Sequence, residues 1–284
     1  MRYTTLIDTS TLAAKIGDPS LAVVDCRFDL KDTGAGERAY GEGHIPGAVY
    51  AHVDRDLSGE TTGTNGRHPL PPVETFVATV GRLGIDASIQ VVVYDQDSGG
   101  FAGRLWWMLR WLGHDNVALL DGGFAKWTAE GRPTTAGVEV RTRRVFVPHI
   151  QPRMVVNAGE VANAAVSKDW RLIDARAPER FRGEIEPIDK VAGHIPGAIN
   201  VPFLENLGAT GTFKSAADLA ERFHKAVGSI PTDHVVVYCG SGVTACQNLL
   251  AMEHAGLHGA RLYAGSWSEW SSDPSRPMAT KSKY

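Results

Sequence analysis

Short runs of consecutive apolar residues alternate along the chain with longer segments whose apolar residues recur at helical spacing. The runs are rich in Val, Ile and Leu and are not interrupted by polar residues, which is typical of strands buried on both faces. They are LAVVDCR (21–27), QVVVYD (90–95), RLIDAR (171–176) and HVVVYC (234–239). Helices are predicted over residues 71–84, 100–113, 215–228 and 244–256. This alternation predicts an α/β fold with a mostly parallel sheet flanked by helices on both faces.

The same pattern is written twice. Four sequence blocks return in the same order at nearly constant spacing, which indicates a tandem repeat. The pairs are 23–27 with 172–176, GHIPGA at 43–48 with GHIPGA at 193–198, 91–99 with 235–243, and 119–127 with 262–270. We therefore predict two domains of the same fold, over residues 1–135 and 154–284. Residues 136–153 carry four arginines and two prolines without helical periodicity, so we expect an extended linker on the surface.

Composition narrows the function classes. The 284 residues are 43% hydrophobic and 21% charged with a net charge of −3, enough to bury two ordinary cores. The lack of a basic block argues against nucleic acid as a partner. No apolar run approaches the ~18 residues of a spanning helix, and the N-terminus lacks a signal-peptide pattern. With three cysteines, at least one thiol is free, and we expect a reducing, cytoplasmic location without membrane contact.

Candidate chemistry lies where the two copies differ. In open parallel sheets, ligands bind at the carboxyl ends of strands. After its VVVY strand the first copy has Asp95, whereas the second has Cys239 followed by Gly240, Ser241, Gly242, Val243 and Thr244. Successive N–H groups of such a small-residue loop, at the start of a helix, favour a thiolate over a thiol. The glycines leave space for an added sulfur atom. Cys239 is thus predicted to be a nucleophile that carries a persulfide, and the first copy a scaffold.

Simpler interpretations apply elsewhere. Cys26 and Cys246 are predicted to be buried structural thiols. His44 and His194 occur in both copies, so we expect them to form hydrogen bonds that hold a turn. A cysteine phosphatase would need an arginine in the loop to hold a phosphoryl group, and residues 240–246 contain none. No residue pattern has metal-ligand or nucleotide-loop spacing, so we expect no cofactor.

GHIPGA in both halves, CGSGVTA (239–245) and SWSEW (266–270) resemble the rhodanese superfamily of tandem-domain sulfurtransferases, over essentially the whole chain. The Cys-Gly-Ser-Gly loop is similar to that of the 3-mercaptopyruvate sulfurtransferases, whereas thiosulfate sulfurtransferases carry Arg and Lys after the cysteine. The resemblance implies two rhodanese-like domains and a catalytic cysteine in the second.

The resemblance also implies further site residues. Arg180 in ERFRGE (179–184) matches the arginine that binds the donor's anionic group. Ser241, His68 and Asp54 match a serine, histidine and aspartate relay, with the site then lying between the domains. The second arginine of the mercaptopyruvate branch has no clear match, since Lys190 is nearby but has no guanidinium fork.

These observations predict a monomeric sulfurtransferase that moves sulfur from 3-mercaptopyruvate to a thiol, cyanide or a thioredoxin-like protein. Two alternatives stay open. One is a thiosulfate sulfurtransferase, and the other is a sulfur-relay module that acts on a protein partner.

Overall fold

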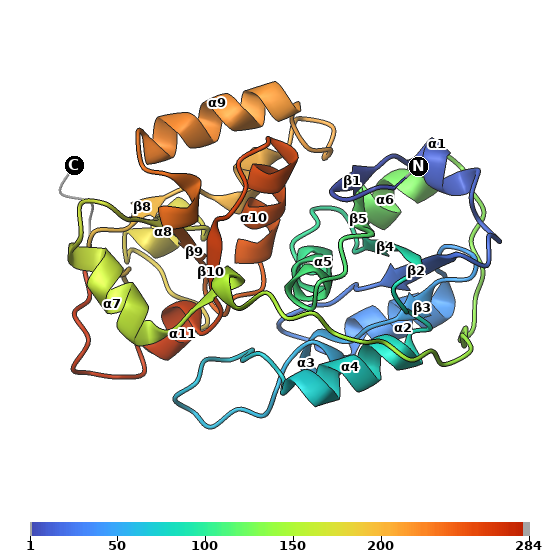
Figure 1. The fold of residues 1–284 in the computed structure, drawn as a ribbon, viewed down its shortest axis with the longest axis horizontal. Coiled ribbons are helices and arrows are strands. Elements are labelled where there is room, and N and C mark those ends of the chain that lie inside the picture. Colours follow the sequence, from blue (N-terminus) through green and yellow to red (C-terminus); the bar gives the residue numbers. More distant parts are fainter. Residues whose placement is uncertain (1, 281–284) are drawn as a thin grey trace. The chain divides into compact units, whose positions relative to one another are not determined.

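The computed structural model describes residues 2–280, so Met1 and residues 281–284, at the outer ends of the two predicted domains, lie outside it. The chain divides into two compact units (Figure 1). Unit 1 comprises Met1–Gly59, Leu70–Gln151 and Leu207–Phe213. Unit 2 comprises Glu60–Pro69, Pro152–Asn206 and Lys214–Tyr284. Each half of the sequence thus lends a short segment to the other unit.

Unit 1 is built on a sheet of five strands in the order β1-β5-β4-β2-β3, with every pairing parallel. Its strands are β1 (Leu6–Ile7), β2 (Leu21–Asp25), β3 (Val49–Tyr50), β4 (Gln90–Tyr94) and β5 (Val117–Leu120). Its helices are α1 (Thr9–Ala13), α2 (Ala35–Glu42), α3 (Val53–Asp56), α4 (Val73–Arg82), α5 (Ala102–Trp111) and α6 (Gly123–Ala129).

Unit 2 repeats this design with the order β6-β10-β9-β7-β8, again parallel throughout. Its strands are β6 (Val155–Val156), β7 (Arg171–Asp174), β8 (Ile199–Asn200), β9 (Val235–Tyr238) and β10 (Arg261–Tyr263). Its α-helices are α7 (Ala158–Val166), α8 (Pro178–Phe181), α9 (Ala216–Val227), α10 (Ala245–His254) and α11 (Ser266–Trp270). Three 3₁₀ turns are η1 (Pro152–Met154), η2 (Phe203–Asn206) and η3 (Thr232–His234).

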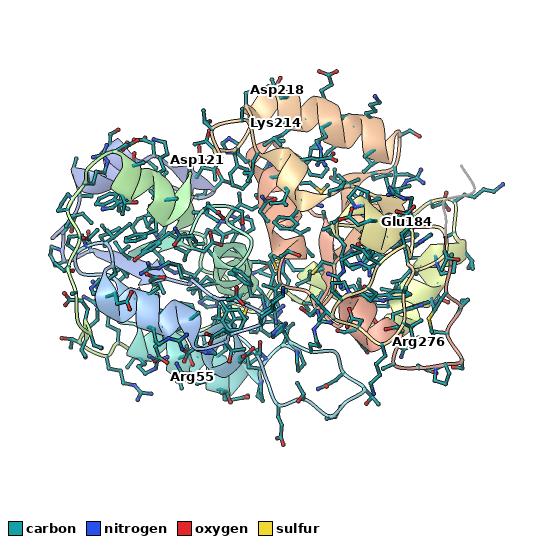
Figure 2. All side chains as sticks on the ribbon, turned by 180° about the vertical axis from the view of Figure 1, so that it is seen from behind. Arg55, Asp121, Glu184, Lys214, Asp218 and Arg276 are labelled. Carbon is teal, nitrogen blue, oxygen red and sulfur yellow. The ribbon has the colours of Figure 1, made fainter. Side chains whose placement is uncertain are left out.

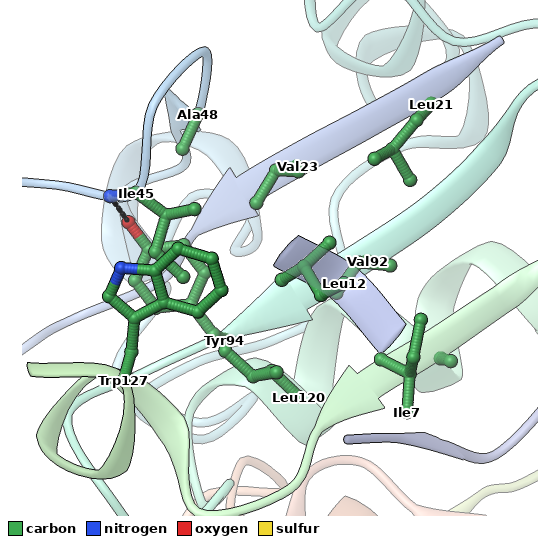
Figure 3. Packing of buried hydrophobic residues seen from close by; sticks show 11 residues of the cluster. Ile7, Leu12, Leu21, Val23, Ile45, Ala48, Val92, Tyr94, Leu120 and Trp127 are labelled. Atoms are coloured by element: carbon green, nitrogen blue, oxygen red, sulfur yellow. Dashed lines mark hydrogen bonds between the residues drawn. The ribbon is translucent and has the colours of Figure 1, made fainter. Parts of the chain in front are cut away.

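Helices cover both faces of each sheet. In unit 1, Leu12 of α1 and Trp127 of α6 pack on one face with Val23 and Val92 of the strands (Figure 3), while α5 packs on the other. In unit 2, Trp267 of α11 belongs to the corresponding cluster, and α10 packs against β9 and β10. The predicted α/β fold of two tandem parallel sheets with helices on both faces is therefore confirmed.

The repeated sequence blocks hold each other in place. The tyrosine that ends each VVVY strand receives a backbone N–H bond from GHIPGA, Tyr94 from Ile45 (Figure 3) and Tyr238 from Ile195, at 3.2 Å in both units. The histidine of the motif bonds to a backbone carbonyl, His194 to that of Phe181 at 2.7 Å. His44 likewise bonds to the carbonyl of Tyr40 at 2.9 Å, so the predicted hydrogen-bonding role of both histidines is confirmed.

Residues 207–213 belong to unit 1 and residues 60–69 to unit 2, and hydrogen bonds within each unit hold these two segments. Phe213 donates its N–H to Oδ1 of Asp121 at 2.8 Å within unit 1 (Asp121 is labelled in Figure 2). In unit 2, Arg67 donates its N–H to Oγ of Ser268 at 3.1 Å. Gly66 has a φ of +86°, and a Cβ there would lie 2.8 Å from the carbonyl oxygen of Gly265. Segment 60–69 therefore packs closely against the start of α11.

Residues 136–151 form no helix or strand and group with unit 1, where Arg144 and His149 donate N–H bonds to Gly81 and Leu112. Their valines 138, 140, 145 and 147 are exposed. Within residues 2–280, no helix has the length and apolar character needed to cross a membrane.

Candidate active site

Cys239 is the first residue after β9 and is 2% exposed. Its backbone is fixed at both polar groups, because its N–H donates to Oγ of Ser266 at 3.1 Å and its carbonyl accepts from the N–H of Trp267 at 3.0 Å. The carbonyl of Gly240 accepts from Ser268 at 2.9 Å. The start of the loop is thus attached to α11, which limits where the thiol can point.

Ser266 stabilises this attachment in an uncommon conformation. Its φ is +54°, the only positive value for a non-glycine residue among residues 2–280. Its hydroxyl accepts from Cys239 and donates to the carbonyl of Tyr263 at 2.9 Å. The matching position of the first copy is Gly123, with a φ of +59°. A serine replaces glycine in the copy whose loop carries the thiol, and its side chain bonds to that loop. Sequence patterns did not single out this residue.

A backbone donor is directed at the sulfur. Gly242 donates its N–H to Sγ of Cys239 at 3.2 Å, and α10 begins three residues later. Val243 and Thr244 complete the turn, with Thr244 at the N-cap of the helix. This arrangement favours negative charge on the sulfur through an N–H bond and the positive end of a helix.

Gly242→Ala should test this turn. Gly242 has a φ of +75°, and a Cβ would lie 2.2 Å from the carbonyl oxygen of Ala264. We expect the substitution to lower the free energy of unfolding by about 1–3 kcal/mol and to slow reaction at the thiol. Thermal unfolding and the rate of thiol alkylation measure the two effects.

Gly256→Ala is the matched control for that change. Gly256 also has a positive φ, +79°, but nothing lies within 4 Å of its Cβ position. Gly256→Ala should slightly lower the free energy of unfolding, because alanine disfavours a positive φ, and should leave the reactivity of the Cys239 thiol unchanged. Equal effects of the two substitutions would contradict the role of close packing at Gly242.

The equivalent loop of unit 1 binds its own anion. The Asp95 carboxylate accepts N–H bonds from Gly99, Phe101 and Ala102 at 2.8–3.0 Å. Burial raises the pKa of Asp95, and these N–H bonds oppose that shift. The first copy therefore shows that this strand–loop–helix geometry presents converging N–H donors. Its donors are already occupied by a carboxylate.

Two arginines lie beside the cysteine loop. An ideal Cβ on Gly240 would be 3.0 Å from Nη2 of Arg67, and 3.5 and 3.6 Å from Nη2 and Nη1 of Arg180. Arg180, at the end of α8, was a sequence prediction, and Arg67 was not. NGRHPLP (65–71) was considered only for its histidine. Its place in unit 2 depends on tertiary contacts that no local pattern reveals.

The predicted serine and histidine are neighbours. Nδ1 of His68 lies 2.7 Å from Oγ of Ser241, and both residues are buried. Asp54 lies in unit 1, in the first turn of α3, where its N–H bonds to Nδ1 of His52 at 3.1 Å. The relay role of Asp54 stays a prediction.

The other thiols are buried away from solvent. Cys246 lies inside α10 and donates its S–H to the carbonyl of Gly242 at 3.4 Å. Burial raises the pKa of the Cys26 thiol well above its ordinary value. All three cysteines are free thiols. Among residues 2–280, no group of three His, Cys, Asp or Glu side chains could hold a metal ion.

Comparison with known proteins agrees with this geometry. The profile of the rhodanese-like domain matches residues 8–130 and 157–273. The chain is 47% identical to the "Probable 3-mercaptopyruvate sulfurtransferase" of Pseudomonas aeruginosa, over 97% of this chain and 98% of the relative. It is 42% identical to the "Putative thiosulfate sulfurtransferase SseB" of Mycobacterium tuberculosis, over 96% of each. The crystal structure of SseA from Escherichia coli, a 3-mercaptopyruvate sulfotransferase, has a TM-score of 0.81 at 33% identity, covering 93% of this chain and 99% of that one.

Proposed function

The chain belongs to the rhodanese-like domain family of sulfurtransferases, and we propose that it moves sulfur from 3-mercaptopyruvate to a thiophilic acceptor through a persulfide on Cys239. The observation that carries the proposal is the pair of contacts around the loop. The N–H of Gly242 bonds to the sulfur of Cys239, and the hydroxyl of Ser241 bonds to His68. One contact favours a nucleophilic sulfur, and the other supplies a group that can deliver a proton.

In the donor step, the thiolate of Cys239 attacks the sulfur of 3-mercaptopyruvate. A sulfur–sulfur bond forms and the carbon–sulfur bond breaks, with its electron pair leaving on the pyruvate enolate. The enolate carbon then takes a proton, which we assign to the Ser241 hydroxyl with His68 behind it. Asp54 would orient His68. No external oxidant is needed, because the leaving carbon keeps the electron pair of the carbon–sulfur bond. That carbon is reduced to the methyl group of pyruvate, while the sulfurs of Cys239 and of the donor are oxidised from the thiol to the persulfide level.

The acceptor step regenerates the thiolate. A thiol, cyanide or thioredoxin-like protein attacks the outer sulfur and takes it away. The loop of Gly240, Gly242, Val243 and Thr244 would surround this outer sulfur, and Arg180 would hold the carboxylate of the donor. The three free thiols favour a reducing compartment, and we propose the cytoplasm.

Thiosulfate is the second candidate donor. Two guanidinium groups beside Gly240 could bind its charged sulfonate, and several relatives carry the thiosulfate name. We favour 3-mercaptopyruvate because sulfite leaves as a stable anion and has no use for the proton donor at Ser241.

The test is the kcat/KM of the protein with each donor, measured side by side with the same acceptor. We expect a higher value with 3-mercaptopyruvate, and intact mass after donor treatment should show one added sulfur. A preference for thiosulfate would overturn the donor assignment. A protein that takes up no sulfur from either donor would overturn the proposal as a whole.

A further inference from the structure

The guanidinium groups of Arg67 and Arg180 converge on the space above Gly240, within 3.0–3.6 Å of where a side chain would begin. Their side chains are 27% and 16% exposed, so the space is reachable from solvent. Two like charges repel each other at such a short separation, and such an arrangement needs a compensating anion.

Asp189 supplies part of that compensation. Its side chain is 5% exposed and bonds to both arginines, Oδ1 to Nη1 of Arg67 and Oδ2 to Nη2 of Arg180 at 3.3 Å. Glu186, also buried, bonds to Nη2 of Arg180 at 2.6 Å and to its Nε at 3.2 Å. Burial raises the pKa of Glu186, but the bonds from Arg180 and from the N–H of Asp189 outweigh it and lower the pKa overall.

These carboxylates do not use every donor. Nη1 of Arg180 and Nη2 of Arg67 make no hydrogen bond to any of residues 2–280, although both groups lie beside Gly240. Guanidinium N–H groups left in a partly buried site suit a planar, two-oxygen acceptor. The absence of a side chain at Gly240 keeps the space open next to the thiol.

We propose that Arg67 is a second donor-binding residue, which binds the carboxylate of the sulfur donor together with Arg180. Asp189 is the positioning residue that fixes both guanidinium groups. This inference rests on the proposed function and assigns to Arg67 a role that the sequence pattern assigned to no residue. Two adjacent residues of segment 60–69 would then act in the donor step. Arg67 would bind the donor carboxylate, and His68 bonds to the hydroxyl of Ser241.

The charge of the cluster favours one class of donor. Arg67, Arg176 and Arg180 are joined in one network to Asp174, Glu186 and Asp189. The three positive and three negative charges cancel, so the site offers directed N–H donors without a large excess of positive charge. A monoanionic carboxylate such as that of a 2-oxo acid suits it better than a dianion such as thiosulfate.

Arg67→Ala tests the proposal, with Arg67→Lys as the variant that keeps the charge and loses the fork. We expect Arg67→Ala to raise the KM for 3-mercaptopyruvate and the inhibition constant of pyruvate about 10- to 100-fold, the range for losing hydrogen bonds to a charged group. Arg67→Lys should recover part of that loss. Transfer from preformed persulfide to acceptor should keep its rate.

Arg182→Ala is the matched control, since Arg182 forms its ion pair with exposed Glu184 (labelled in Figure 2), two residues along the chain. It should leave both constants unchanged.

Asp189→Asn should raise the KM for 3-mercaptopyruvate by a larger factor than it lowers kcat. Thermal unfolding of the variant checks that the rise in KM does not come from loss of the fold. Unchanged KM and pyruvate inhibition in folded Arg67→Ala would overturn the inference. Failure of the proposed function is distinguishable, because the wild-type protein would then form no persulfide.

Discussion

Cys239→Ser is expected to abolish sulfur transfer, with kcat falling by roughly 10⁴-fold or more, as when a covalent nucleophile is removed. A serine hydroxyl stays protonated at neutral pH and cannot hold a sulfur atom as a persulfide. The backbone contacts of the loop should survive, because Cys239 is anchored through its own N–H and carbonyl. Intact mass after donor treatment should show an added sulfur on the wild-type protein and none on the variant.

The other two thiols provide controls for that result. Cys26 and Cys246 are both fully buried, and Cys26→Ser and Cys246→Ala should keep most of the turnover with at most a modest loss of stability from repacking. A persulfide found on either residue, or transfer retained by Cys239→Ser, would contradict the central assignment.

Sequence alone singled out Cys239 as the candidate nucleophile because its signal is local. Four apolar residues of β9 are followed directly by small residues and then by α10, and the repeat supplies an internal comparison. The contrast with Asp95 separates the loop that binds its own carboxylate from the loop that carries a free thiol. Parallel-sheet topology follows from the same alternation of strands and helices.

Arg67 and Ser266 could not be found in the same way. Arg67 reaches the site because its N–H bonds to Ser268, 201 residues away, and its side chain to Asp189, 122 residues away. Hydrophobic periodicity reports on neighbours within a helix or strand and carries no information about such contacts. Ser266 was seen only as part of the SWSEW block, whereas its importance depends on a positive φ and on two bonds.

The exchange of segment 60–69 has a consequence for how the site is assembled. His68 belongs to unit 2 although it is encoded in the first half of the sequence. Its contact with Ser241 therefore forms within one compact unit. The tandem repeat predicts the folds of the two halves. It does not predict that residues 60–69 pack in unit 2, because this segment is an irregular loop whose path depends on residues such as Gly66, which has a positive φ.

Ser241→Ala should separate the two candidate donors. With 3-mercaptopyruvate the leaving group is an enolate that needs a proton, so we expect kcat to fall by about 10²- to 10⁴-fold, the usual contribution of general acid catalysis. With thiosulfate the leaving sulfite is a stable anion, and turnover should change little. The measurement is the ratio of kcat values for wild type and variant with each donor, using one acceptor.

His68→Gln completes the test as a double-mutant cycle. If His68 acts through the hydroxyl 2.7 Å away, combining it with Ser241→Ala should cost little more than the serine change alone. Ser241→Ala removes only one oxygen at a buried position, so the fold should persist and thermal unfolding checks that it does. Equal losses with both donors would mean that Ser241 shapes the loop, whereas a loss confined to 3-mercaptopyruvate identifies it as the proton donor to the leaving carbon.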